Sequence, residues 1–196
     1  EDLWNYFAEK DSIIDASGWT SSYTGETLSE KEMAEYVENT ITKVSPYIKP
    51  DATVLEIGCG SGLTTFSLAK HVKRYYASDL SKSIINRNKK RAQEEGFSHI
   101  TFDVSAAHEV LFPEGEVDVV IINSVVHCFP NYGYLKAVLF KAVQSLKEGG
   151  VIFLGDLLDY QRKEDFIQSL HEFKEINPSS PTKLDWETDL FVSETI

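Results

Sequence analysis

The stretch Val54-Leu55-Glu56-Ile57-Gly58-Cys59-Gly60-Ser61-Gly62 decides the fold. An apolar run leads directly into three glycines at alternate positions, and a helical pattern follows them. Glycine lets the backbone turn sharply and approach a ligand without interference from a side chain. The stretch therefore predicts a strand, a glycine loop and a helix, which is the arrangement of a nucleotide-binding α/β protein.

An acidic residue further along the chain strengthens the nucleotide prediction. Asp79 follows Gly60 by nineteen residues, at the end of the next expected strand, where a carboxylate can accept hydrogen bonds from both hydroxyls of a ribose. Dinucleotide oxidoreductases share this layout, but their loop reads G-x-G-x-x-G and cradles a pyrophosphate. Here the loop reads G-x-G-x-G and follows Glu56. This acid would repel a pyrophosphate and favours a cationic ligand, such as the α-amino group of a methionine moiety.

Strand and helix patterns alternate after residue 50. Apolar segments predict strands over 53–58, 74–79, 99–104, 117–124 and 150–156, and amphipathic segments predict helices over 62–72, 82–95, 132–147 and about 162–174. The alternation predicts a doubly wound α/β fold with a mainly parallel sheet. Segment 117–124 is almost wholly apolar, so we expect it in the middle of the sheet. We divide the chain into an N-terminal helical lead-in or lid, 1–50, and a core, 51–196.

Composition and charge narrow the class of protein. The 196 residues, 42% hydrophobic and 26% charged, fit one globular domain. A net charge of -12 argues against nucleic acid as a partner. No apolar run reaches the roughly 18 residues of a membrane span. Cys59 lies in the glycine loop, far in sequence from Cys128, so we expect free thiols and a cytoplasmic setting. The chain begins with Glu1, so we expect an excised domain or a processed chain.

These segments resemble the motifs of class I S-adenosylmethionine (SAM)-dependent methyltransferases, which have a Rossmann-like fold. Segment 54–62 looks like their first motif, 75–81 like their ribose-binding motif, 101–105 like the segment whose acid contacts the adenine amine, and 146–153 like their late helix-to-strand turn. The resemblance implies SAM as methyl donor and S-adenosylhomocysteine as product. It implies cofactor contacts from Glu56, Gly58, Cys59, Gly60, Gly62, Asp79, Leu80, Asp103, Val104, Asn123 and Ser124. No pair of histidines or cysteines has the spacing of a metal site.

A narrower resemblance involves the methyltransferase domains embedded in nonribosomal peptide synthetases and polyketide synthases. Segment 18–25, Gly-Trp-Thr-Ser-Ser-Tyr-Thr-Gly, is similar to their entry segment, 123–130 to their fourth-strand motif, 155–157 to their fifth-strand end and 189–192 to an acidic-hydrophobic motif near their C-terminus. The implied partners are neighbouring synthase domains and an acyl or peptidyl carrier protein that presents a tethered substrate. We expect Tyr23, with Trp19, to close over the SAM or shape an acyl pocket; the alternative is packing at the sheet edge.

The sequence departs from this family in two ways. His127 stands where many such domains, particularly those acting on nitrogen, carry Gln. Most class I methyltransferases also finish with a helix and a β-hairpin, for which the residues before Ile196 leave no room. We therefore expect the hairpin to be absent, so that either the chain is truncated or something else completes the sheet edge.

His127 supplies the mechanistic hypothesis. A hydroxyl nucleophile must lose its proton, and a histidine just after the fourth strand suits a general base, oriented by Glu187, Asp189 or Asp156. The sequence thus favours O-methylation of a carrier-tethered polyketide or peptide intermediate. N-methylation of a tethered aminoacyl group is the first alternative, followed by C-methylation and by an inactive, SAM-binding structural module. A nicotinamide oxidoreductase is the alternative outside the methyltransferases.

Overall fold

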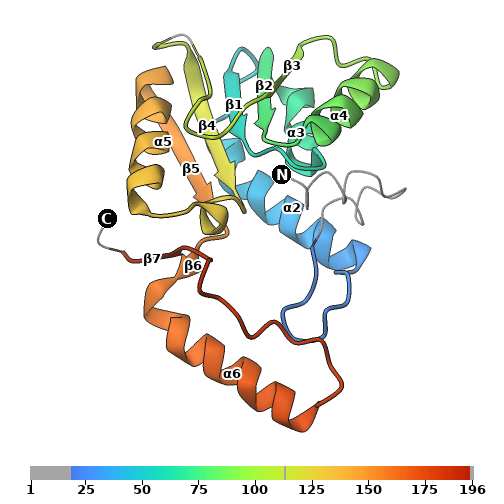
Figure 1. Ribbon diagram of the computed structural model, residues 1–196. Coiled ribbons are helices and arrows are strands. Elements are labelled where there is room, and N and C mark those ends of the chain that lie inside the picture. The colour runs from blue at the N-terminus through green and yellow to red at the C-terminus, as the bar shows by residue number, and fades with distance from the viewer. Residues whose placement is uncertain (1–18, 113, 195–196) are drawn as a thin grey trace.

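The computed structural model describes residues 19–112 and 114–194, and at its centre lies a five-stranded sheet in the order β3-β2-β1-β4-β5 (Figure 1). All neighbouring strands in this sheet are parallel. The strands are β1 (Thr53–Ile57), β2 (Arg74–Asp79), β3 (Ile100–Val104), β4 (Val117–Asn123) and β5 (Leu146–Gly155). The predicted doubly wound, parallel α/β fold is confirmed, and β4 lies in the interior of the sheet, next to the central strand β1. The strand order reverses between β1 and β4, where such folds form their ligand crevice.

Helices cover both faces of the sheet. Neighbouring residues of an inner strand point to opposite faces, so each face has its own hydrophobic cluster. Val54 and Val119 pack into a hydrophobic cluster with α3 and α4, whereas Leu55 and Val120 pack into a second cluster with α5. This double burial explains why apolar residues predominate in β1 and β4.

The helices begin where the sequence provides capping side chains. Ser29 forms a capping box with Glu32, and Ser81 and Asn131 each accept a backbone hydrogen bond in the first turn of their helix. The helices are α2 (Glu30–Val44), α3 (Leu63–Leu68), α4 (Lys82–Glu94), α5 (Tyr132–Ser145) and α6 (Lys163–Ile176), with 3-10 turns η2 (Ser45–Tyr47), η3 (Ala69–His71), η4 (Val126–Cys128) and η5 (Tyr160–Arg162). Each predicted helix is present.

One strand begins earlier than its sequence indicates. The glycine pair 149–150 predicts a loop before a strand at 150, yet β5 starts at Leu146, which pairs with Val117. The register then shifts, so that Val119 pairs with Val151. The extra residues of β5 form a bulge. Gly149 has a φ of 77° there, a backbone conformation that glycine adopts without steric cost.

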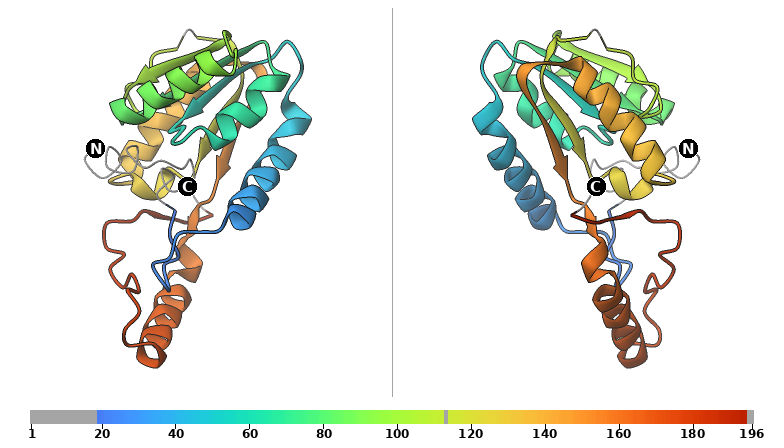
Figure 2. Two further views of the ribbon diagram at one scale, coloured as in Figure 1. Left: turned by 90° about the vertical axis from the view of Figure 1, so that its right-hand side faces the viewer. Right: turned by 90° about the vertical axis from the view of Figure 1, so that its left-hand side faces the viewer.

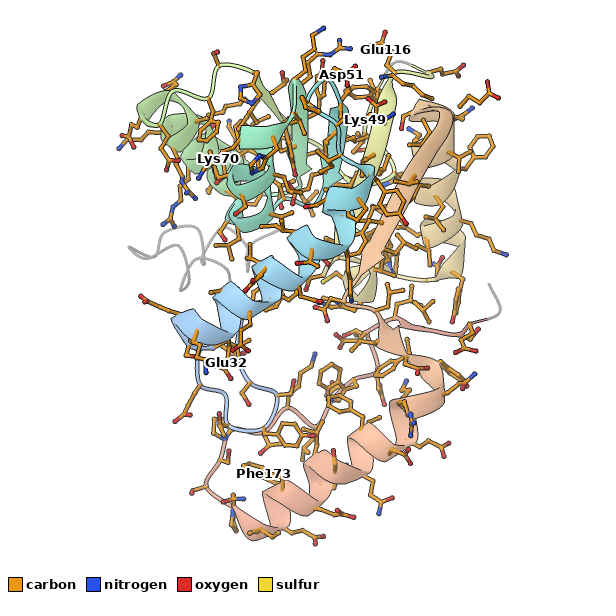
Figure 3. All side chains as sticks on the ribbon, turned by 180° about the vertical axis from the view of Figure 1, so that it is seen from behind. Glu32, Lys49, Asp51, Lys70, Glu116 and Phe173 are labelled. Atoms are coloured by element: carbon orange, nitrogen blue, oxygen red, sulfur yellow. The ribbon has the colours of Figure 1, made fainter. Side chains whose placement is uncertain are left out.

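A smaller unit stands apart from the sheet, and we call it the α6 unit: residues 20–27 and 158–192. It contains α6 and a two-stranded parallel pair, β6 (Leu158–Asp159) with β7 (Phe191–Val192). Figure 2 shows α6 extending away from the sheet. Tyr23 packs edge-to-face on Phe173, a residue of α6 that is labelled in Figure 3. The N-terminal and C-terminal ends of the described chain therefore pack on each other.

The far edge of the sheet is open in the described residues. Within 19–112 and 114–194, β5 pairs with β4 alone, and no antiparallel hairpin follows it. In the same part of the chain, no helix has the length and apolar character needed to cross a membrane.

Candidate functional site

The glycine loop joins β1 to α3 at the carboxyl edge of the sheet. Gly58, Gly60 and Gly62 have φ angles of 79°, 49° and 82°, a region that other L-residues rarely adopt. At Gly58 there is also no space, since a Cβ atom would lie 2.4 Å from a methyl carbon of Val125. At Gly60 the surroundings are open, so there the glycine is required by the backbone conformation alone.

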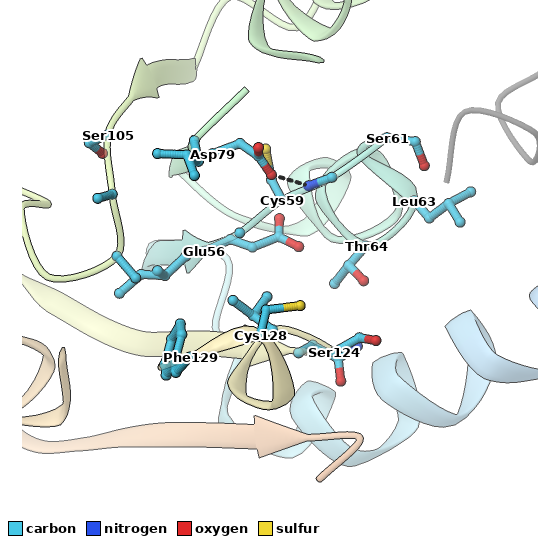
Figure 4. A pocket seen from close by; sticks show the side chains of 18 of the residues that line it. Glu56, Cys59, Ser61, Leu63, Thr64, Asp79, Ser105, Ser124, Cys128 and Phe129 are labelled. Atoms are coloured by element: carbon cyan, nitrogen blue, oxygen red, sulfur yellow. Dashed lines mark hydrogen bonds between the residues drawn. The ribbon is translucent and has the colours of Figure 1, made fainter. Parts of the chain in front are cut away.

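Asp79, at the end of β2, is bonded to this loop. Its Oδ2 accepts a hydrogen bond from the backbone N–H of Gly60 at 3.0 Å, drawn as a dashed line in Figure 4. Its Oδ1 accepts another from the N–H of Ser81 at 2.9 Å. Burial raises the pKa of Asp79, and these backbone donors partly offset that rise. Asp79 and the glycine loop, which are nineteen residues apart in sequence, are therefore in direct contact in the structure.

Glu56 is the more unusual acid, because a carboxyl group is buried in the middle of a parallel sheet. Only 3% of the residue is exposed, and burial raises its pKa to about 7. The hydroxyl of Tyr75 donates a hydrogen bond to Oε2 at 2.8 Å, and that of Thr65 donates to the same oxygen. Both hydrogen bonds reach Oε2, and Glu56 also lines a cavity. A cationic ligand group there would stabilise the ionised form.

The two acids and the loop line one cavity of about 260 Å³ at the strand-order reversal (Figure 4). Ser105, just after β3, also lines it, and its hydroxyl is buried without a hydrogen-bond partner in the described structure. A buried hydroxyl without a partner is costly, which points to a polar ligand group at that end. The lining residues are Trp19, Tyr36, Glu56, Ile57, Gly58, Cys59, Gly60, Ser61, Leu63, Thr64, Asp79, Leu80, Ser105, Ala106, Ala107, Asn123, Ser124, Val125, Cys128, Phe129, Pro130 and Tyr134.

Sequence comparison identifies relatives of this chain. A family model described as a methyltransferase domain matches residues 54–150. The probable non-canonical nonribosomal peptide synthetase CymA of Salinispora arenicola is 37% identical over 161 residues, which are 82% of this chain and 2% of that protein. The chondramide synthase of Chondromyces crocatus is 37% identical over 171 residues, 85% of this chain and 4% of that protein. The chain therefore spans a few per cent of the length of these curated relatives.

Solved structures share the fold. Phosphoethanolamine N-methyltransferase 1 of Haemonchus contortus, in complex with phosphoethanolamine and S-adenosylhomocysteine, has a TM-score of 0.63 at 20% identity, over 78% of this chain and 30% of that one. The N-methyltransferase NodS of Bradyrhizobium japonicum has a TM-score of 0.59 at 22% identity, over 74% of this chain and 84% of that one.

The chain is a class I SAM-dependent methyltransferase. Its relatives in sequence include segments of nonribosomal peptide synthetases.

The cavity of this methyltransferase fits the parts of SAM. The buried Glu56 carboxyl suits the cationic α-amino group, the Asp79 carboxyl suits the ribose hydroxyls, and the unpartnered Ser105 hydroxyl suits a polar edge of the adenine. The glycine loop lies between these groups, where the backbone can approach the ligand closely.

The methyltransferase cavity collects most, but not all, of the predicted cofactor residues. Eight of them line it: Glu56, Gly58, Cys59, Gly60, Asp79, Leu80, Asn123 and Ser124. Gly62 instead caps the start of α3, where an added Cβ would meet Phe66 at 2.6 Å. Asp103 and Val104 lie exposed at the end of β3, two residues and one residue before Ser105.

Tyr23 lies in the α6 unit and is not among the residues that line the methyltransferase cavity. Its hydroxyl pairs with that of Ser169 at 2.8 Å, and its backbone oxygen accepts hydrogen bonds from the side chains of Ser180 and Thr182. Trp19 is the aromatic residue of this segment that reaches the cavity.

The three residues predicted for catalysis, His127, Glu187 and Asp189, lie outside the cavity lining, and the charge of Asp189 acts on His127. Leu190 donates its N–H to the backbone oxygen of His127 at 2.8 Å, which holds the C-terminal segment against η4. Burial lowers the pKa of His127, and the charges of Asp156 and Asp189 partly offset this. Asp189 pairs with Lys183 at 2.8 Å, and Glu187 is exposed. In the described chain no acid hydrogen-bonds to the His127 ring, and the neighbouring Cys128 and Phe129 line the cavity instead.

Two lining residues, Ser105 and Tyr36, have no sequence signal that separates them from ordinary residues. Ser105 follows the adenine-motif acid by two positions, and only the backbone path after β3 turns its side chain inward. Tyr36 sits within an amphipathic helix, and its ring packs edge-to-face on Trp19 with centroids 4.2 Å apart. From its position in the helical pattern alone, Tyr36 would be predicted to be a packing residue.

Proposed function

We propose that this methyltransferase N-methylates an aminoacyl group that is tethered to a carrier protein within a nonribosomal peptide synthetase. The single observation that carries the choice of nitrogen is the position of His127, whose side chain is not part of the cavity lining. A hydroxyl acceptor needs a base within hydrogen-bond reach. An amine loses its proton to solvent near neutral pH and then needs alignment more than a base.

The residues of the chain have separate tasks in this mechanism. When bound, SAM supplies an electrophilic methyl group on a sulfonium. Glu56 holds the cationic amino group, Asp79 accepts hydrogen bonds from the ribose, and the glycine loop positions both through the Asp79–Gly60 hydrogen bond. Trp19 and Phe129, with other apolar lining residues, exclude water from the cavity.

O-methylation with His127 as base is the second candidate. It is favoured by the lowered pKa of His127, which keeps the ring neutral near pH 7, and by the proximity of Asp156 and Asp189. This candidate requires the His127 ring to turn toward the acceptor, with one of these acids or Glu187 as its orienting partner.

Support for a tethered substrate comes from the relatives named as nonribosomal peptide synthetases, and from the resemblance of this chain to the methyltransferase domains embedded in such enzymes. The proposed partners are thus a carrier protein and neighbouring synthase domains; the net charge of -12 disfavours nucleic acid. Cys59 and Cys128 are both free thiols, which suits a cytoplasmic location.

The test is mass spectrometry of a carrier protein loaded with either an aminoacyl or a 2-hydroxyacyl group and incubated with the chain and SAM. We expect the aminoacyl form to gain one methyl group. A gain on the hydroxyacyl form alone selects the second candidate, and no gain on either form refutes both in favour of an inactive, SAM-binding module.

A further inference from the structure

Ser124, which lines the SAM cavity, forms a pair at the carboxyl edge of the sheet with Asp156, to which the SAM site assigns no role. They directly follow β4 and β5, and the backbone N–H of Ser124 donates to the oxygen of Gly155 at 3.1 Å. The Ser124 hydroxyl donates to Oδ2 of Asp156 at 2.7 Å. Ser124 lines the cavity, while the Asp156 carboxylate is exposed at its rim. The pair therefore connects the methyl-donor cavity to solvent.

The backbone at this pair is strained. The φ angles of Ser124 and Asp156 are 57° and 53°, and among the described residues these are the two positive φ values outside glycine. Left-handed backbone is unfavourable for both residue types and persists where the surrounding structure imposes it. A strained pair beside a ligand cavity is more easily explained by a role in that cavity than by stability.

Tyr36 of α2 completes the group. It lines the same cavity, and its hydroxyl lies close to the side chain of Ser124. Burial raises the pKa of Tyr36, and the negative charges of Asp156 and Glu56 raise it further. The hydroxyl therefore stays protonated, and the charges that act on it are both negative. A positively charged group is favoured in such a place over a neutral one.

We propose that Asp156, oriented by Ser124 and facing Tyr36, binds the ammonium group of the methyl acceptor at the rim of the cavity and so selects amines over hydroxyls. This inference rests on the proposed function and names the residues that recognise its substrate.

The transfer itself balances with the chain's residues as positioning groups. The bound ammonium gives one proton to solvent at the exposed rim, and the nitrogen lone pair forms the new N–C bond. The S–C bond breaks and its electron pair stays on sulfur, which becomes neutral. The positive charge thus moves to the methylated nitrogen, which releases a second proton to solvent. Asp156 stabilises the charged nitrogen before and after transfer.

The variant Asp156→Asn tests the charge without removing the geometry. Asn keeps an oxygen that accepts the Ser124 hydrogen bond, and it tolerates left-handed backbone. Asp159→Asn is the matched control, since Asp159 is also exposed, lies three residues further on, and accepts a backbone hydrogen bond from Gln161 at 2.8 Å that Asn retains.

The measurement is calorimetric binding to the complex with S-adenosylhomocysteine, so that no turnover is needed. The probes are alanyl-pantetheine amide and lactyl-pantetheine amide, which differ only in an amine against a hydroxyl. We expect the natural chain and Asp159→Asn to prefer the alanyl probe by about fivefold, the upper range for a partly exposed ion pair, and Asp156→Asn to lose the preference. A preference retained in Asp156→Asn, equal affinities in the natural chain, or no binding of the alanyl probe each overturns the proposal.

A kinetic readout separates positioning from general structure. With alanyl-pantetheine thioester, Asp156→Asn should raise KM while kcat changes less, and Ser124→Gly should do the same although it relieves the strained φ. Equal losses in kcat with unchanged KM would contradict a binding role. If the natural chain transfers no methyl to the alanyl thioester, the proposed function fails, while the binding preference is still decided by the calorimetry.

Discussion

Replacing Glu56 by Gln separates the charge of this residue from its hydrogen bonds. Gln fills the same space, and its side-chain oxygen can accept the bonds that Thr65 and Tyr75 donate to Oε2. The substitution removes only the ionisation of a carboxyl whose pKa burial raises to about 7. Any pH dependence that Glu56 causes must therefore vanish in Glu56→Gln.

The expected magnitude for SAM binding follows from that pKa. Below pH 7 the free protein holds a proton on Glu56, and binding a cationic amino group requires its release. Affinity should fall about tenfold for each pH unit below 7, so that at about pH 5 it is roughly 100-fold weaker, or about 2.7 kcal/mol. Above about pH 8 the α-amino group of SAM loses its own charge, so affinity should be highest between about pH 7 and 8.

The stability of the free chain should change in the opposite direction. The pKa of Glu56 rises from 4.5 to about 7 on folding, so the free energy of unfolding is greatest below pH 4.5 and decreases as pH rises through this window. The difference of about 2.5 units corresponds to an upper limit of roughly 3 kcal/mol. Glu56→Gln should therefore stabilise the ligand-free chain above pH 7 while weakening SAM binding.

Titration calorimetry measures both affinity and proton release when it is repeated in buffers of different ionisation enthalpy. For the natural chain we expect release to approach one proton at about pH 5.5. For Glu56→Gln we expect a smaller release, because Asp79 is then the one carboxyl group lining the cavity whose pKa is raised. If Glu56→Gln keeps the full slope of affinity against pH, Glu56 is not the group that binds the cation, and the reasoning from its burial is refuted.

Three further predictions use conservative substitutions. Gly58→Ala should lower the free energy of unfolding, measured with denaturant, by more than the roughly 1–2 kcal/mol of left-handed backbone strain, because Val125 also crowds the new Cβ. Gly96→Ala, with a φ of 78° and open space around it, should be destabilised by the backbone strain alone. Tyr75→Phe removes a donor to Glu56, so the pH midpoint of SAM binding should shift upward, with about 1 kcal/mol less stability; an unchanged midpoint would contradict the shared hydrogen bond. His127→Ala should leave amine methylation nearly intact; a loss of about 100-fold or more in turnover would instead identify a general base.

The sequence predicts the sheet well because its signals are local. Buried parallel strands require apolar runs, and a tight strand-to-helix turn requires glycine, so β1, β4 and the loop follow from residue type alone. Asp79 is predictable because the length of one βαβ unit fixes its distance from the loop. The start of β5 is not, because Leu146 pairs with Val117 through a bulge that depends on the neighbouring strand.

Side-chain direction is what the sequence does not determine at this site. His127 and Cys128 are adjacent in one turn of 3-10 helix, yet Cys128 lines the cavity and His127 does not. Likewise, Trp19 reaches the cavity while Tyr23, four residues later, packs in the α6 unit. Each choice depends on contacts with segments more than sixty residues away, such as the bond from Leu190 to the His127 oxygen. A sequence motif therefore predicts which segment lies near the cavity, but it does not predict which residue of that segment faces the cavity.

Several features that oppose folding in this chain lie along one cavity, and their position there bears on function. Glu56 has a buried carboxyl group, and Ser105 has a buried hydroxyl without a partner among the described residues. Ser124 and Asp156 each have a left-handed backbone conformation. Each feature is unfavourable in the ligand-free protein. A cation beside Glu56, a polar group beside Ser105 and an ammonium beside Asp156 would each offset the free-energy cost of one feature. Substitutions that remove these features should therefore stabilise the free chain and weaken binding of SAM or acceptor, whereas a residue that serves folding alone would lose stability when replaced.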